Sequence, residues 1–231
     1  MRRALWLAVA AVALLMVASA VAGAAETEEY HPAIDPANFV ARIDNPYLPF
    51  LPGTTFVYEA KTEDGLERSE VVVTHRTKVI MGVTCTVVRD TESVDGKVEE
   101  VTLDWYAQDK AGAVWYFGED SKAYRKGKVV STSGSWEAGV NGAKPGILME
   151  ADPKVGDTYH QEYAKGVAED MATVVALDAS ATVPYGSFHG CLKTKEFSPL
   201  EPGVAEHKLY ARGVGNIVDA ELKLVSVTHE E

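Results

Sequence analysis

From Pro49 onward, runs of β-branched and aromatic residues alternate with short turn-forming sequences. Runs such as TTFVYEAKT, SEVVVTHRTKVI and VTCTVVRDTE are separated by dipeptides such as Asp64-Gly65, Met81-Gly82 and Asp95-Gly96. These turn signals recur roughly every 8 to 15 residues, which is the spacing of hairpin-connected strands. The pattern predicts a mainly β protein, a single antiparallel meander that forms a strongly curved sheet or a barrel.

Three segments depart from this pattern. DPANFVARIDNP predicts one short N-terminal helix, because Asp35 can cap it, Pro36 suits its first position and Pro46 would end it. GVAEDMATVVAL fits a helix or a strand, and its Thr-Val-Val centre favours the strand. Residues 131–147 contain five Gly or Pro and several Ser, which predicts a long loop around Trp136.

Residues 1–24 carry the features of a secretory signal peptide. Arg2 and Arg3 precede an uncharged apolar run, and Ala22-Gly23-Ala24 has the small-x-small pattern of a cleavage site. The alternative is a retained membrane anchor, which the cleavage pattern and the lack of following basic residues make the weaker interpretation. We therefore expect an N-terminal extension at 25–48, a single β-rich domain at 49–231, and an extracytoplasmic location, either periplasmic or secreted.

The net charge of the chain limits the classes of molecule that it is expected to bind. The full chain has 22 basic and 34 acidic residues, a net charge of -12, and removal of Arg2 and Arg3 would make it more negative. Such a charge repels nucleic acids and anionic membrane surfaces and is compatible with cationic ligands. No second apolar run reaches spanning length, so we expect no membrane span after signal cleavage. The oligomeric state is left open.

Two cysteines, Cys85 and Cys191, occur in the chain. In an oxidising compartment an isolated pair is most simply one disulfide. The alternative is two buried thiols. A cysteine-based metal site is disfavoured because neither residue belongs to a CxxC-type motif.

An aromatic-rich hairpin, DWYAQDKAGAVWYF, is the first candidate for ligand binding. With Asp109 to Gly112 as its loop, Tyr106 would lie opposite Trp115 and Trp105 opposite Tyr116. Such rings can form core pairs or a platform for a ligand, since barrel interiors serve both purposes. We expect the ligand-lining residues to come from one set: Trp105, Tyr106, Trp115, Tyr116 and Trp136.

The stretch YHQEYAKGVAED is the second candidate, for a divalent cation. On a strand His160 and Glu162 would share one face, and a turn at Gly166 could bring back Glu169 and Asp170. Histidine and carboxylates are suitable metal ligands, although a structural site needs three or four of them. The competing interpretation, an ordinary solvated strand, is the favoured one because such spacing is common in exposed strands. No other cofactor is indicated.

Catalytic motifs are lacking in the sequence. It contains neither GxSxG nor HExxH, and no serine has the context of an activated nucleophile. His189 and Cys191 would share a strand face as a Cys-His pair, but a disulfide at Cys191 would exclude that role. Paired carboxylates for glycoside hydrolysis leave no signature in a sequence, so an enzyme without a recognisable motif stays an alternative.

Three segments resemble secreted bacterial envelope proteins of largely unknown function. LPGTTFVYE, TVPYGSFHGCLKT at 182–194 and YARGVGNIVD at 210–219 are similar to the TapB-like and DUF3108-like proteins, which resemble in turn the LolA-type lipoprotein carriers. The resemblance implies a curved antiparallel sheet with a concave apolar face, which holds acyl chains in the carriers. The leading hypothesis is therefore non-enzymatic binding of an apolar or amphipathic small molecule, and the metal-binding envelope protein is the alternative.

Overall fold

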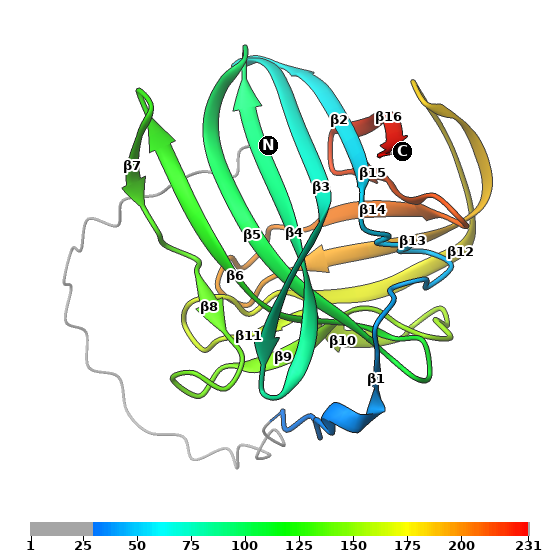
Figure 1. The fold of residues 1–231 in the computed structure, drawn as a ribbon. Coiled ribbons are helices and arrows are strands. Elements are labelled where there is room, and N and C mark those ends of the chain that lie inside the picture. Colours follow the sequence, from blue (N-terminus) through cyan, green and yellow to red (C-terminus); the bar gives the residue numbers. More distant parts are fainter. Residues whose placement is uncertain (1–29, 231) are drawn as a thin grey trace, which may run out of the picture. The chain divides into compact units, whose positions relative to one another are not determined.

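Antiparallel strands dominate the part of the chain that the computed structural model describes, residues 30–230 (Figure 1). The predicted signal peptide, residues 1–24, lies outside the described residues. No helix in the described part is long and apolar enough to cross a membrane. The predicted fold class, a mainly β barrel-like antiparallel sheet, is confirmed.

The first half of the sheet is a meander of five strands. These are β2 (Thr54–Thr62), β3 (Gly65–Ile80), β4 (Val83–Val94), β5 (Lys97–Asp109) and β6 (Val114–Arg125). The turn at Asp95-Gly96 has positive φ at both residues, as does the turn at Met81-Gly82. Two-residue turns of this kind match the right-handed twist of the strands, so the local sequence itself selects these hairpins.

A second meander forms the other half and closes one side of the sheet. Its strands are β12 (Met171–Val183), β13 (Gly186–Phe197), β14 (Glu206–Ala211), β15 (Gly215–Asp219) and β16 (Leu222–His229). Strand β16 pairs with β2, which joins the last strand of the chain to the first strand of the meander. The segment at 171–183 is a strand, as its Thr-Val-Val sequence predicts.

The two remaining ends of the sheet meet within one short stretch of chain. Strand β10 (Thr158–His160) pairs with β12, and β11 (Glu162–Tyr163) pairs with β9 (Lys144–Met149), which pairs in turn with β6. Only Gln161 separates β10 from β11. The segment 158–163 therefore forms a seam that bridges the two meanders.

Three short strands pair with β5 or β6 in addition to the two meanders. Strand β1 (Phe39–Val40) pairs with β5, while β7 (Lys128–Ser131) and β8 (Trp136–Glu137) both pair with β6. The segment predicted as one long loop, 131–147, thus contains β8 and the start of β9. Gly134, Gly139 and Gly142 lie at turns between these short pairings, and Gly146 lies within β9.

The predicted N-terminal helix is only one turn of 3-10 helix, η1 (Pro36–Asn38). Asp35 caps it as expected, since its Oδ1 accepts the Ala37 N–H at 2.9 Å. The helix ends there because the next residues pair with β5, and because the Gln108 side chain of β5 accepts the N–H groups of Asp44 and Asn45. Hydrogen bonds to β5 therefore engage the backbone groups that a second helical turn would need.

The predicted disulfide is wrong. Cys85 lies in β4 and Cys191 in β13, and strands β14, β15, β16, β2 and β3 separate these two in the sheet. Both residues are buried free thiols. A disulfide needs Cα atoms within about 7 Å, which wall strands this far apart do not provide. Burial raises the pKa of the Cys85 thiol to about 12, so it stays protonated and unreactive at neutral pH.

Candidate ligand-binding pocket

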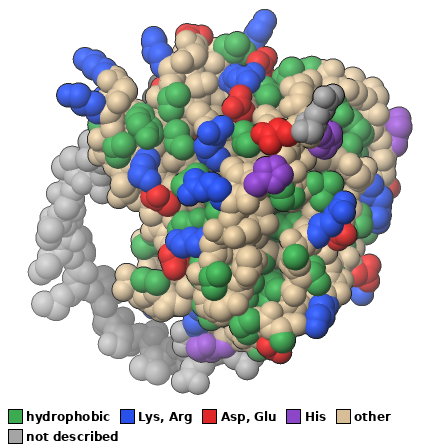
Figure 2. Space-filling model, in the orientation of Figure 1, with side chains coloured by type: hydrophobic (Ala, Val, Ile, Leu, Met, Phe, Trp, Pro, Cys, Tyr) green, Lys and Arg blue, Asp and Glu red, His purple; other side chains and the backbone are tan. Residues whose placement is uncertain are grey.

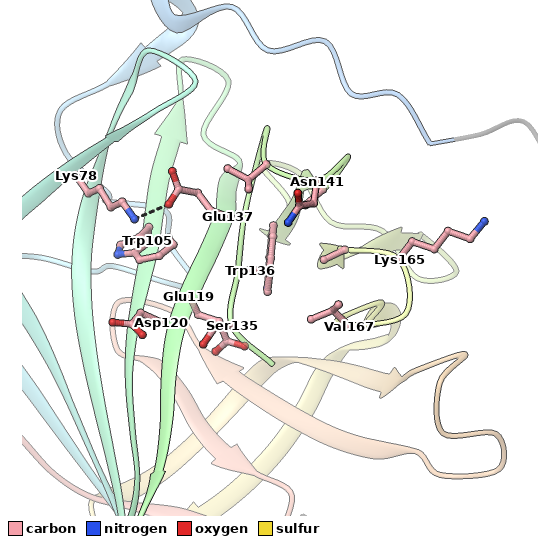
Figure 3. Close-up of a pocket in the computed structure, with 13 residues that line it drawn as sticks. Lys78, Trp105, Glu119, Asp120, Ser135, Trp136, Glu137, Asn141, Lys165 and Val167 are labelled. Atoms are coloured by element: carbon pink, nitrogen blue, oxygen red, sulfur yellow. Dashed lines mark hydrogen bonds and ion pairs between the residues drawn. The ribbon is translucent and has the colours of Figure 1, made fainter. Parts of the chain in front are cut away.

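A pocket of about 450 Å³ opens beside β8, where strands from the first meander meet two later turns. Its wall combines two tryptophans, small apolar residues and charged side chains (Figure 3). The lining residues are Lys78, Trp105, Glu119, Asp120, Ser135, Trp136, Glu137, Val140, Asn141, Ala143, Ala164, Lys165 and Val167. The volume lies within the range of small-molecule sites, and the mixed lining suits a ligand with apolar and polar parts.

One wall of the pocket is built from Lys78, Trp105 and Glu137. The Lys78 Nζ lies 3.3 Å from the centroid of the Trp105 ring and 2.7 Å from Glu137 Oε2 (Figure 3). These residues come from β3, β5 and β8, so three elements distant in sequence meet here. The arrangement sets an ammonium group against an aromatic face and a carboxylate at the same time.

The Trp136 ring forms the centre of the pocket wall. It packs edge-on against Tyr116 with centroids 5.4 Å apart, and Tyr116 stacks on Tyr106 with centroids 4.6 Å apart. Trp136 is 6% exposed, and its buried Nε1 has no hydrogen-bond partner within the described part of the chain. Ring packing rather than a side-chain hydrogen bond therefore holds the indole of Trp136 in place.

A β-bulge in β6 allows β8 to reach the pocket. Asp104 pairs with Glu119 while Tyr106 pairs with Tyr116, so Phe117 and Gly118 together oppose Trp105 alone. Gly118 has a φ of 126°, and a Cβ there would overlap the backbone of Trp136. Glycine at 118 is therefore needed for β8, and with it Trp136, to approach β6.

Exposed apolar side chains frame the pocket entrance. Val140 and Val167 line the pocket and are 48% and 49% exposed, and Met81 packs against Gly139 beside them. Over the face seen in Figure 2, acidic, basic and hydrophobic side chains are interspersed, without a continuous field of one charge.

The predicted ligand-lining aromatics divide into three groups. Trp105 and Trp136 line the pocket, and Tyr106 and Tyr116 form the stacked pair behind Trp136. Trp115 lies elsewhere: its ring packs against Phe39, and its Nε1 donates to Asp109 Oδ2 at 3.0 Å.

The predicted register of this hairpin is wrong by one residue. Tyr106 lies opposite Tyr116, and Ala107 lies opposite Trp115. The loop is one residue shorter than expected, since the Asp109 N–H donates to the Ala113 carbonyl oxygen and only residues 110–112 lie between them. Asp109 Oδ1 also accepts the N–H groups of Gly112 and Ala113, which stabilises this tight loop.

A β-bulge also separates the four residues predicted to bind a metal. The N–H groups of Gln161 and Glu162 both donate to the Asp170 carbonyl oxygen, at 2.8 and 3.1 Å. His160 and Glu162 therefore do not share a face as predicted, and the His160 ring packs edge-on against Tyr163 instead. Glu169 Oε1 accepts the Gly166 N–H in the adjacent turn.

Glu162 points instead toward carboxylates on β5 and β6. Burial, together with the charges of Asp170, Glu119 and Asp104, raises its pKa well above the ordinary value, and Lys208 partly opposes this rise. Burial also lowers the pKa of His160, although the Glu169 charge acts in the opposite direction. Among residues 30–230, no three His, Cys, Asp or Glu side chains form a group suited to a metal ion.

A second buried polar group joins strands of the C-terminal meander. The Lys208 Nζ lies 3.1 Å from Glu196 Oε2 and 3.2 Å from Asp219 Oδ2, and Tyr210 donates its hydroxyl to Glu196 at 3.3 Å. The Gln161 side chain donates to Glu196 from the seam at 3.4 Å. These contacts stabilise the closure between β10 and the C-terminal strands.

Four charged residues of the pocket lining could not be found from the sequence: Lys78, Glu119, Asp120 and Glu137. Glu137 directly follows Trp136 in the glycine-rich segment, which is the only local signal for it. The other three lie in runs of consecutive polar residues within strands, and nothing nearby marks them as site residues. Their convergence depends on strand pairing over long sequence distances.

Comparison with known proteins returned no match to a protein family, to a curated protein or to a solved structure. The resemblance to the TapB-like and DUF3108-like envelope proteins therefore stays a prediction.

Proposed function

We propose that this protein binds a small amphipathic molecule in the pocket beside β8, in an extracytoplasmic setting. The observation that carries the proposal is the pocket of about 450 Å³ in which Trp105 and Trp136 face a polar lining. Concave sites with aromatic walls and a few polar groups are the usual binding sites for small molecules.

The lining favours an amphipathic ligand over a purely apolar one. Glu119, Asp120 and Glu137 all line the pocket, and an acyl chain alone would remove them from water without replacing their hydration. The apolar part of a ligand can instead contact Trp136, Val140 and Val167, while its polar part lies near the carboxylates.

The proposal is binding rather than catalysis because two of the pocket carboxylates are held in ion pairs. Glu137 pairs with Lys78, and Asp120 pairs with Lys122. A lysine paired with a carboxylate fixes the orientation of that carboxylate, which suits recognition better than proton transfer.

Calorimetric titration with dodecylphosphocholine below its micelle concentration tests the proposal. We expect binding to the wild-type protein and a roughly tenfold weaker affinity for Trp136→Leu, because the central apolar surface of the pocket is lost. Trp136→Phe, which keeps an aromatic ring, should lose less.

Trp115→Leu is the matched control, since Trp115 belongs to the same hairpin and lies outside the pocket lining. Thermal melts of each variant separate a loss of binding from a loss of folding. Equal affinities for Trp136→Leu and Trp115→Leu, with both variants folded, would contradict the proposal.

A further inference from the structure

We infer that the pocket recognises an ammonium group, and that Lys78 occupies this recognition site as an internal stand-in for the ligand. The inference depends on the proposed binding function and names the chemical class of the ligand: a small amphipathic cation.

The contacts of Lys78 are those by which proteins bind alkylammonium ligands. Its Nζ lies over the Trp105 ring at 3.3 Å from the centroid and forms an ion pair with Glu137 at 2.7 Å (Figure 3). An aromatic face attracts a cation through its quadrupole, and tryptophan does so most strongly. Together, Trp105 and Glu137 form a cation site within the pocket wall.

Lys78 is suited to leave this site. Its side chain is 36% exposed and that of Glu137 is 35% exposed, so the ion pair between them is partly solvated. Such pairs contribute little net stability, because water compensates for their separation. The flexible four-carbon stem of lysine allows the ammonium to move into solvent while the β3 backbone stays in place.

The charges of the pocket favour replacement by another cation. Three carboxylates and two lysines line it, and the second lysine, Lys165, is exposed on the turn at Gly166. When Lys78 moves out, a ligand ammonium restores the charge beside Glu137. An anionic headgroup would instead meet three carboxylates, Glu119, Asp120 and Glu137, against only the two lysines of the lining.

The arrangement also predicts what the rest of the ligand contacts. Figure 3 shows Trp136 between the Lys78 and Trp105 wall and the side that carries Lys165 and Val167. A ligand with its ammonium over Trp105 can therefore extend along Trp136 toward the apolar entrance at Val140 and Val167. This places the charged end of the ligand inward and its apolar end at the exposed valines.

The test compares dodecyltrimethylammonium with dodecyl sulfate, both below their micelle concentrations, by isothermal titration calorimetry. We expect the wild-type protein to bind the ammonium probe at least tenfold more tightly than the sulfate. Lys78→Met removes the internal competitor and should raise the affinity for the ammonium probe about tenfold. Glu137→Gln and Trp105→Leu should each lower that affinity, because they remove one half of the cation site.

Lys122→Met is the matched control. Lys122 pairs with Asp120, its side chain is also 36% exposed, and its loss changes the net charge as much as the loss of Lys78 does. It does not line the pocket. If Lys78→Met and Lys122→Met raise the affinity equally, the gain reflects net charge and the role of Lys78 as a stand-in is refuted. Lys78→Gln provides a second variant if Lys78→Met proves unstable in thermal melts.

Other outcomes separate this inference from the proposed function. If the wild-type protein binds both probes equally, ammonium recognition is refuted while amphiphile binding stands. If neither probe nor dodecylphosphocholine binds to the wild-type protein or to folded Lys78→Met, both the inference and the proposed function fail.

Discussion

At the scale of single residues, Glu150 is a partly buried carboxylate whose pKa is changed by its surroundings. Glu150 follows β9, and its side chain hydrogen-bonds to Asp157. Burial first, and then the Asp157 charge and this hydrogen bond, raise its pKa from an ordinary value of 4.5 to about 7. A raised pKa means that folding favours the protonated carboxyl group.

Glu150→Gln is therefore expected to reduce the pH dependence of stability. In the wild type, the contribution of protonated Glu150 is fully present below pH 4.5 and is lost as the pH rises through about 7. Glutamine stays neutral, so the variant should gain about 1 to 2 kcal/mol relative to the wild type between these two pH values, allowing for the partial exposure of the site.

Urea unfolding at pH 4.5 and pH 8 measures this difference. Glu99→Gln, at an exposed position of β5, is the control and should change stability equally at both pH values. A parallel pH dependence for the wild type and Glu150→Gln would contradict the assignment.

At the scale of elements, bulges change the face of the sheet to which a side chain points, and close backbone approaches decide which strands can pair. The bulge at Gln161 and Glu162 turns Glu162 away from His160, and the bulge at Phe117 and Gly118 makes room for β8. The seam depends on a similar approach, since a Cβ at Gly146 would overlap the backbone of Gln161. Small residues at these points decide which strands can meet.

Gly146→Ala should weaken the seam between β9 and β11. The overlapping atoms belong to the backbone and cannot move aside as a side chain could, so we expect a loss of about 2 to 3 kcal/mol. Urea unfolding gives the free energy of unfolding, and hydrogen exchange shows whether Glu162 and Tyr163 lose protection first.

Gly186→Ala is the matched control for the seam, because a Cβ there meets only the Phe188 ring at ordinary contact distance. It should cost less than about 0.5 kcal/mol. Similar losses in the two variants would show that Gly146 is not needed for closure.

At the scale of the whole molecule, two meanders form one sheet through two different closures. Strand β16 pairs directly with β2, and the segment 158–163 bridges β12 and β9. This closure leaves Cys85 and Cys191 buried in separate parts of the wall. The protein therefore carries two protected thiols instead of a covalent cross-link.

The thiols provide a test of this architecture. In protein purified without reductant, we expect neither cysteine to react with a thiol reagent in the folded state and both to react after denaturation. A reductant should leave the melting temperature unchanged. A single reduction-sensitive bond in peptide mass spectrometry would contradict the separation of β4 and β13.

The parts of the fold that could be predicted are those with local signals. Asp95-Gly96 specifies its hairpin because both residues adopt positive φ, and Asp35 with Pro36 specifies the start of η1. The register of Tyr106 against Tyr116 could not be predicted, because it depends on a loop that is one residue shorter, with Asp109 paired to Ala113. One residue is enough to change which side chains face each other across a hairpin.

By itself, the sequence determined the antiparallel class and most strand positions, because alternation and turn chemistry act over a few residues. Only the tertiary structure decided that Lys78, Trp105 and Glu137 meet, and that Cys85 and Cys191 do not. The physical reason is that the register between distant strands depends on every bulge and every loop length that lies between them along the chain. A single shift moves a side chain to another partner or to the opposite face of the sheet.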